Sequence, residues 1–272
     1  MRRKVVLTSI NGVGIGQTAT LDLPVGGRRY FGLFLIYKTN AAQATIEADI
    51  TEVRLIINGK PQRRFSAADL NVVNATNGLA FTVGYLPIIL AEPRRRTIAG
   101  EEGLAWGTVG VSTFRVEIDI AVGAVAPTLT AFAEVDDIPS PLGPIAKWYK
   151  ETFIATGAQT LNLNTLPKRD AYNRIHARSA LVTRMKATVD GLEVYDLDRT
   201  TAGVVMSRRL SLAQQVNNFS MVFDDSDQVT DGIPMTKSTP EGIVPVGEFR
   251  LDVTVSAAGT IPLLIERVGQ PD

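Results

Sequence analysis

The amino-acid sequence predicts an all-β protein made of two tandem β-sandwiches with a few short helices. Three observations predict it: strand-like alternations that recur half a chain apart, tight-turn dipeptides at matching places in both halves, and a proline-rich segment between the halves. The 272 residues are 45% hydrophobic, which allows a substantial core, and the length suits two domains of ordinary size.

The alternating segments give the clearest repeat. Residues 114–120 read Phe-Arg-Val-Glu-Ile-Asp-Ile and residues 249–255 read Phe-Arg-Leu-Asp-Val-Thr-Val, so apolar and polar residues alternate through both. Such alternation is typical of a strand with one buried face. A shift of 135 residues superimposes the two segments and also takes Pro127 to Pro262, and half of the 272 residues is 136. The displacement is therefore that of a duplicated unit.

Each half also has a hairpin signal after another alternating run. Asn58-Gly59 and Asp190-Gly191 end such runs at a shift of 132 residues, and both favour tight turns because their residues tolerate positive φ. Near the start of each half, residues 17–23 match residues 159–163 at a shift of 142. Three landmarks in the same order predict two copies of one β-domain.

The boundary between the copies is marked by proline. Pro139, Pro141 and Pro144 disfavour helix and resist sheet pairing. We therefore predict a first domain over residues 1–138, a linker over 139–148 and a second domain over 149–272.

Signals for helices are few. Ser66 and Asp69 form a capping-box pattern that predicts a short helix, and a second short helix is expected within residues 207–216. Each half also has a long irregular segment before its last strands, residues 85–107 and 224–247. Loops of this length usually have a function, so we expect contacts with neighbouring subunits or surface decoration there.

Composition restricts the classes of function. Lys plus Arg and Asp plus Glu each total 28, which argues against a broad nucleic-acid-binding surface. Cysteine is absent, which excludes disulfides and thiolate metal sites and suits a reducing cytoplasm. We expect no secretory signal and no membrane span, because no apolar run reaches about 18 to 20 residues. Any contact with a membrane is expected to be peripheral.

Catalytic residues are not predicted. His176 is the only histidine, so a multi-histidine metal centre cannot form, and no G-x-S-x-G turn accompanies it; a structural role is favoured. Gly12, Gly14 and Gly16 do not have the spacing of a dinucleotide-binding loop, and a turn or arm is the simpler interpretation. No cofactor-binding residue is predicted. Carboxylate-based glycoside hydrolysis is the weakest alternative.

A weak cation site is predicted in the second half, with ligands Asp224, Asp225, Asp227 and Asp231. Carboxylate oxygens are the ligands that Ca²⁺ prefers. The segment lacks the glycine and final glutamate of an EF-hand loop, so a structural calcium ion and a plain solvated loop are both alternatives.

Two basic clusters are candidates for contact with a subunit or a membrane. One is Arg2, Arg3 and Lys4, and the other is Arg94, Arg95 and Arg96 in the long segment of the first half. A solvated segment, charge pairing across a subunit boundary, and contact with anionic lipid headgroups are the three alternatives for each cluster.

A carbohydrate- or receptor-binding module, such as a phage spike or an adhesin, is the second hypothesis for function. Such sites present aromatic side chains on loops. Trp106, Trp148 and Tyr149 are the candidates, although anchoring the core is the favoured role for them.

Two segments resemble a known family. Residues 107–120 with 127–131, and residues 7–10 with 21–26, are similar to the corresponding stretches of corticovirus major capsid proteins, which are double jelly-roll coat proteins of membrane-containing icosahedral phages. The resemblance implies two eight-stranded jelly rolls and a homotrimeric, pseudo-hexagonal capsomer. It further implies an icosahedral shell around an internal lipid membrane, assembly in the host bacterial cytoplasm, and contacts with neighbouring trimers, a vertex (penton) protein and the internal membrane or its proteins. Sequence-specific nucleic-acid binding is not expected.

Overall fold

The computed structural model describes the chain except for residues 8, 93–97, 211 and 225–231. It consists of two compact units, which are described separately. Unit 1 contains residues 1–148 and 270–272, and unit 2 contains residues 149–269. The division therefore falls between Trp148 and Tyr149.

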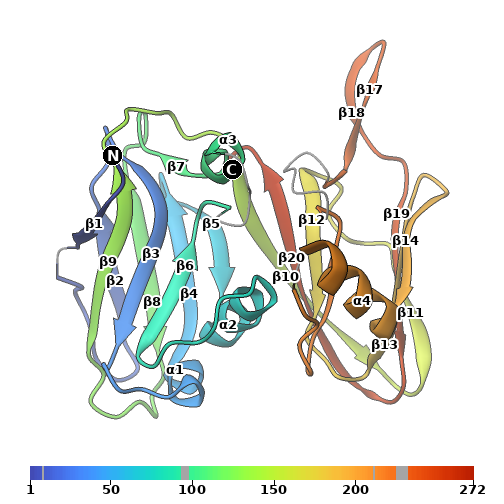
Figure 1. Ribbon diagram of the computed structural model, residues 1–272, viewed down its shortest axis with the longest axis horizontal. Helices are drawn as coiled ribbons and strands as arrows, with labels where there is room; N and C mark the ends of the chain where they lie inside the picture. Colours follow the sequence, from blue (N-terminus) through green and yellow to red (C-terminus); the bar gives the residue numbers. More distant parts are fainter. Residues whose placement is uncertain (8, 93–97, 211, 225–231) are drawn as a thin grey trace. The chain divides into compact units, whose positions relative to one another are not determined.

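Unit 1 is a sandwich of two antiparallel sheets (Figure 1). The first sheet has the order β1-β9-β3-β6, with β7 also pairing with β3, and the second has the order β2-β8-β4-β5. The strands are β1 (Arg3–Val6), β2 (Thr18–Leu23), β3 (Arg29–Tyr37), β4 (Ile50–Ile57), β5 (Lys60–Phe65), β6 (Tyr85–Ile89), β7 (Trp106–Gly107), β8 (Phe114–Ile120) and β9 (Leu129–Asp136).

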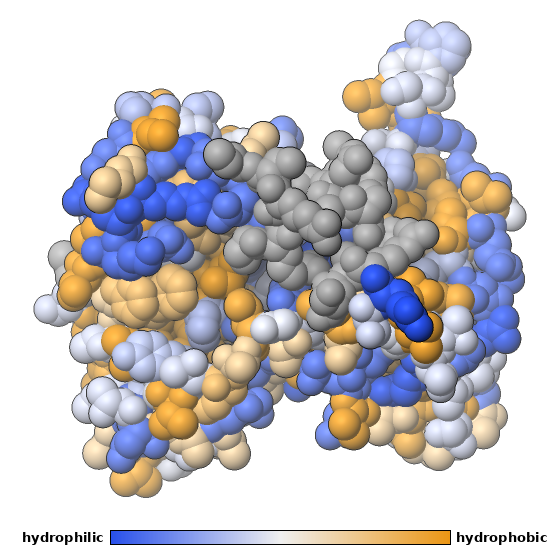
Figure 2. Space-filling view, viewed as in Figure 1, coloured by the Kyte–Doolittle hydropathy of each residue, from blue (hydrophilic) through white to orange (hydrophobic). Residues whose placement is uncertain are grey.

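Unit 2 repeats this strand order position by position. Its first sheet is β10-β20-β12-β15 with β16 also pairing with β12, and its second sheet is β11-β19-β13-β14. A separate hairpin, β17-β18, projects from unit 2 (Figures 1 and 2). The strands are β10 (Ile145–Ala155), β11 (Gln159–Leu163), β12 (Ala171–Ala177), β13 (Val182–Val189), β14 (Leu192–Asp198), β15 (Phe219–Val222), β16 (Ile233–Pro234), β17 (Thr236–Thr239), β18 (Gly242–Pro245), β19 (Phe249–Val255) and β20 (Gly259–Gly269). Two sheets whose four principal strands are connected in this order form a jelly roll, which confirms the predicted fold class.

The pairing register shows that the three sequence landmarks are equivalent in space. Ile57 lies opposite Phe114 in unit 1, and Val189 lies opposite Phe249 in unit 2, so the shifts of 132 and 135 residues meet in one register. The 142-residue shift agrees with the same register, because Leu21 lies opposite Val116 in unit 1 and Leu163 lies opposite Leu251 in unit 2. A duplicated domain explains all three displacements.

The predicted hairpin turns form as expected. Asn58 and Gly59 have φ values of 50° and 79°, and Asp190 and Gly191 have φ values of 46° and 81°. Both turns therefore use the left-handed backbone region at two successive residues, as a type I′ hairpin requires.

Four helices are present in the described residues: α1 (Gln43–Asp49), α2 (Ala67–Thr76), α3 (Ile98–Glu102) and α4 (Arg199–Leu210). The capping box at Ser66 and Asp69 is confirmed, since each side chain bonds the backbone N–H of the other residue. The helix expected within residues 207–216 begins earlier, at Arg199, because Asp198 accepts hydrogen bonds from the N–H groups of Thr200 and Thr201. The helices α2 and α4 occupy equivalent connections, each following the hairpin of its unit. All four helices are too short or too polar to cross a bilayer.

The expected linker and long loops contain more regular structure than predicted. Residues 145–148 of the linker are the first residues of β10. The segment 85–107 contains β6, α3 and β7, and the segment 224–247 contains β16, β17 and β18. These short elements escaped prediction because two- to five-residue strands and helices lack a readable period.

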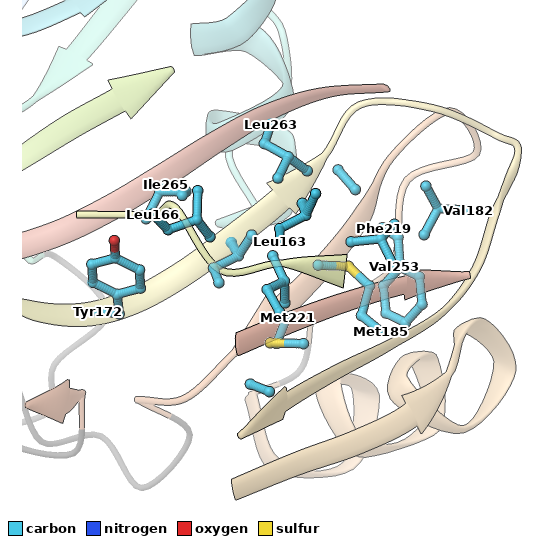
Figure 3. Close-up of a cluster of buried hydrophobic side chains, with 14 of the residues drawn as sticks. Leu163, Leu166, Tyr172, Val182, Met185, Phe219, Met221, Val253, Leu263 and Ile265 are labelled. Atoms are coloured by element: carbon cyan, nitrogen blue, oxygen red, sulfur yellow. The ribbon is translucent and has the colours of Figure 1, made fainter. Parts of the chain in front are cut away.

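Alternating burial explains why these sequences form a sandwich. Phe114, Val116, Ile118 and Ile120 of β8 are all buried, whereas the residues between them face outward. In unit 2, side chains from both sheets fill the interior, among them Leu163, Tyr172, Met185, Phe219 and Val253 (Figure 3). Each large apolar side chain contributes about 1.5–3 kcal/mol on burial, so these layers dominate the stability of each unit.

Candidate assembly surfaces and predicted site residues

Arg2 lies just before β1 and is held within unit 1. Its guanidinium carbon is 4.1 Å from the centroid of the Phe31 ring, and the same group bonds the carboxylates of Glu101 and Glu102 at the end of α3. The hydrogen bond that Arg2 donates to Glu101 raises the pKa of Arg2 above its ordinary value. Arg29 shares Glu102, with 3.0 Å between Nη1 and Oε2. Arg2 thus anchors the start of β1.

Arg3 and Lys4 are more exposed than Arg2. Arg3 pairs with Asp137 at 2.7 Å and Lys4 pairs with Glu134 at 3.1 Å, with 43% and 67% of the two cationic side chains exposed. Exposed pairs of this kind contribute between 0 and about 1 kcal/mol. Both cations can therefore exchange these partners for another carboxylate at little cost.

The structure describes one member of the predicted cation site, Asp224. Asp224 is 1% exposed and forms a bidentate ion pair with Arg174, with distances of 3.1 Å from Nε to Oδ1 and 2.8 Å from Nη2 to Oδ2. Asp225, Asp227 and Asp231 lie outside the described residues, as do Arg94, Arg95 and Arg96. Within the described residues, no three acidic or histidine side chains form a metal-binding group. A structural calcium ion stays a prediction.

His176 is fully buried on β12. Its Nδ1 is 2.8 Å from the Ser220 hydroxyl and its Nε2 is 2.7 Å from a Glu266 carboxylate oxygen. This serine–histidine–carboxylate chain resembles a hydrolase triad. However, Ser220 is 0% exposed, so the serine cannot reach a substrate in this structure. The network instead joins β12, β15 and β20.

The two tryptophans of the binding-module hypothesis are core residues. Trp106 is 0% exposed and Trp148 is 8% exposed. The Arg63 guanidinium carbon lies 5.4 Å from the Trp106 ring centroid and 5.5 Å from that of Trp148. Neither indole is a surface platform for a sugar, and the favoured packing role is confirmed.

A charge network that sequence reasoning missed covers the outer face of the second sheet in unit 1. Arg54 on β4 donates to Glu117 at 2.9 Å and to both carboxylate oxygens of Asp119 at 2.7 and 2.9 Å on β8. It also bonds Glu52, which accepts a further hydrogen bond from Arg64 at 2.7 Å. The alternation itself contained the signal, since these residues are the polar positions of paired strands.

The strand β14 forms an exposed edge in unit 2. Leu192 and Val194 are 68% and 38% exposed. Beside this strand lies a cavity of about 350 Å³, lined by Val194, Tyr195, Leu197, Val205, Val222, Phe223 and Ile233. Exposed aliphatic side chains next to such a cavity are typical of an interaction surface.

Solved structures share this architecture over nearly the whole chain. The crystal structure of the major capsid protein P2 from bacteriophage PM2 has a TM-score of 0.88 at 20% identity and covers 100% of this chain and 98% of its own. The major capsid protein of Sulfolobus turreted icosahedral virus has a TM-score of 0.68 at 10% identity, covering 100% and 97%. The PBCV-1 virus capsid structure has a TM-score of 0.65 at 11% identity, covering 98% and 93%. The fold thus defines the class: the chain is a double jelly-roll protein, with the architecture of these viral capsid proteins.

Sequence comparison identifies the family. The model of the viral coat protein P2 N-terminal domain matches residues 5–136, and that of the viral coat protein P2 C-terminal domain matches residues 145–271. The major capsid protein P2 of Pseudoalteromonas phage PM2 is 26% identical in an alignment 207 residues long, which covers 72% of this chain and 73% of that protein. The chain belongs to the viral coat protein P2 family: it is a phage major capsid protein with a structural role and is not an enzyme.

Proposed function

We propose that three copies of this chain form a capsomer whose six sandwiches imitate a hexagon and pave an icosahedral shell around an internal lipid membrane. The observation that carries the proposal is the identical strand order of the two units, β1-β9-β3-β6 with β2-β8-β4-β5 and β10-β20-β12-β15 with β11-β19-β13-β14. A chain with two similar units gives a three-fold ring six similar positions, which lets it tile a surface.

The partners follow from this arrangement. Copies of the chain contact one another within a trimer and between trimers, a vertex protein closes the five-fold positions, and the internal membrane or its proteins lie beneath the shell. Assembly takes place in the host bacterial cytoplasm, which suits the absence of cysteine. The candidates for lipid contact are the basic clusters at residues 2–4 and 94–96. Arg3 and Lys4 support this assignment, because their side chains are 43% and 67% exposed.

Light scattering on the purified protein tests the oligomeric state. The expected mass is three times the 29.4 kDa of one chain. A strictly monomeric species at high protein concentration contradicts the proposal. Flotation with vesicles that contain anionic lipid tests the membrane contact, and weaker binding of an Arg3→Glu variant, which keeps Lys4 for the contact between copies, is the expected result.

A further inference from the structure

The strands β5 and β14 are equivalent edges of the two units. Each ends a four-stranded sheet and each follows the tight turn of its hairpin. Each also contains one bulge, because Leu55 and Ile56 pair with Arg63 and Pro61, whereas Ala187 and Thr188 pair with Tyr195 and Glu193. The extra residues in the two bulges are Gln62 and Val194, which are 132 positions apart. The same shift equates Arg63 with Tyr195 and Phe65 with Leu197.

In unit 1 the β5 edge is covered. The Arg63 Nε donates to the Ala146 carbonyl oxygen at 2.6 Å, and the backbone N–H of Asp272 donates to the Gln62 side-chain oxygen at 3.0 Å. The Trp148 ring lies 4.9 Å from the Phe65 ring. Gln62 and Arg63 are consequently only 3% exposed. The covering residues, 145–148 and 270–272, are the segments of unit 1 that lead into and out of unit 2 along the chain.

In unit 2 the equivalent edge is open. Val194, the counterpart of Gln62, is 38% exposed, and Leu192 is 68% exposed. The cavity of about 350 Å³ is lined by Tyr195 and Leu197, the counterparts of the two residues beside Trp148 in unit 1. The remaining lining includes residues of β15 and β16, which correspond to β6 and β7 around Arg63. The described residues of unit 2 thus form a surface like the one that is covered in unit 1, and they leave Leu192 and Val194 exposed on it.

The charges near the β14 edge indicate which segment could bind there. The sequence of β14 is Leu-Glu-Val-Tyr-Asp-Leu-Asp, with three acidic residues and no basic one. The edge strand β1 of unit 1 begins Arg-Lys and follows Arg2. It leads into unit 1 as β10 leads into unit 2, and it holds the same place in its sheet order. Among the described strands, β1 pairs with β9 alone and β14 pairs with β13 alone, so each lies at the edge of its sheet.

We propose that β1 of a second copy of this chain covers β14, with Lys4 facing its acidic residues and an apolar side chain of β1 entering the cavity from the other face. The inference rests on the proposed trimer and names its contact surface. In unit 1, the start of β10 covers β5. In the proposed contact, β1 of one copy covers β14 of another copy in the same way, so that unit 1 of each copy meets unit 2 of the next. Such a head-to-tail contact closes into a ring when three copies have joined.

Cysteine cross-linking tests the contact, since the natural chain contains no cysteine. A double variant with Lys4→Cys and Val194→Cys should form covalent dimers and trimers on oxidation, visible on a non-reducing gel and reversed by a reductant. The matched control pairs Lys4→Cys with Asp22→Cys, whose parent side chain on β2 is 65% exposed, and should give no covalent trimer.

Charge exchange gives a second readout that does not depend on bond geometry. Lys4→Glu and Glu193→Lys should each raise the dissociation constant of the trimer at least tenfold, and the combined variant should restore it. Asp22→Lys is the matched control, because Asp22, like Glu193, is an exposed acid paired with a cation on the neighbouring strand. Asp22 lies outside the proposed contact, so this variant should leave the dissociation constant of the trimer unchanged. Far-UV circular dichroism checks that each variant is folded.

The outcomes separate this inference from the proposed function. A trimer that survives both single charge reversals and gives no β1–β14 cross-link overturns the contact and leaves the trimeric capsomer standing. A monomeric natural chain overturns both.

Discussion

Tyr30 and Tyr172 hold the same position in the two sandwiches. The Tyr30 hydroxyl donates to the Pro24 carbonyl oxygen at 2.7 Å, and the Tyr172 hydroxyl donates to the Pro167 carbonyl oxygen at 2.6 Å. Their rings meet Phe114 and Phe249 edge-on, at centroid distances of 5.4 and 5.1 Å and interplanar angles of 82° and 78°. The duplication has therefore kept a local bond and an aromatic contact as well as the order of strands.

Removing either hydroxyl tests this shared contact. Tyr30→Phe and Tyr172→Phe should each lower the free energy of unfolding by about 1 kcal/mol, because each loses one hydrogen bond to a backbone carbonyl in a buried setting. Urea denaturation measures the change. Tyr85→Phe is the matched control, since the Tyr85 side chain is half-buried and makes no hydrogen bond within the described residues. A loss as large in the control means that the two bonds contribute nothing specific.

The two hairpin turns should accept each other's residue. Asn58 Oδ1 accepts from the N–H groups of Ser112 and Thr113 at 2.8 and 3.2 Å, and Asp190 Oδ1 accepts from the N–H of Glu248 at 2.8 Å. Asn58→Asp and Asp190→Asn keep both this acceptor and the tolerance of positive φ, so the melting temperature should change little. Asn58→Ala loses both and should cost about 1–2 kcal/mol. A harmless Asn58→Ala contradicts this account of the turn.

The buried pair of Arg174 and Asp224 should be sensitive to truncation. Their side chains are 2% and 0% exposed, so Asp224→Ala leaves a buried guanidinium without its bidentate partner. The expected loss is about 3 kcal/mol of unfolding free energy, measured by urea denaturation. The exposed pair of Asp22 and Arg115 provides the control, and Asp22→Ala should have no measurable effect. Equal effects in the two variants contradict a structural role for the buried pair.

Acid should weaken unit 1 through its surface charge network. The hydrogen bond from the Arg54 guanidinium holds the pKa of Asp119 below its ordinary value of 3.8. The unfolded chain therefore takes up a proton at higher pH than the folded chain, and this contribution to stability is present above pH 3.8 and lost as pH falls through the folded-state pKa. Asp119→Asn should cost about 1 kcal/mol at neutral pH and flatten the loss of stability below pH 4. Identical pH profiles of unfolding contradict this role of Asp119.

Local signals made much of the fold predictable. Asn58-Gly59, Asp190-Gly191 and the seven-residue alternations act within a few residues, so the sequence alone locates the hairpins and the central strands. The start of α4 was missed, because the helix was expected within residues 207–216, although Asp198 precedes it as a capping residue. Helix α1 was not predicted, since its N-cap residue, Ala42, forms no side-chain cap.

The surfaces depend on contacts between distant residues and were less predictable. His176, Ser220 and Glu266 come from three strands, and only the strand order brings them together. Arg2 was flagged by its charge, but its contacts with Phe31 and Glu101 could not be read from the sequence. The open edge at β14 becomes visible only when the register equates Val194 with Gln62.

Electron cryo-microscopy of the purified oligomer tests the central claim most directly. The account predicts a three-fold ring of six upright sandwiches in which unit 1 and unit 2 alternate. A ring of another symmetry, or a trimer in which like units face each other, contradicts it.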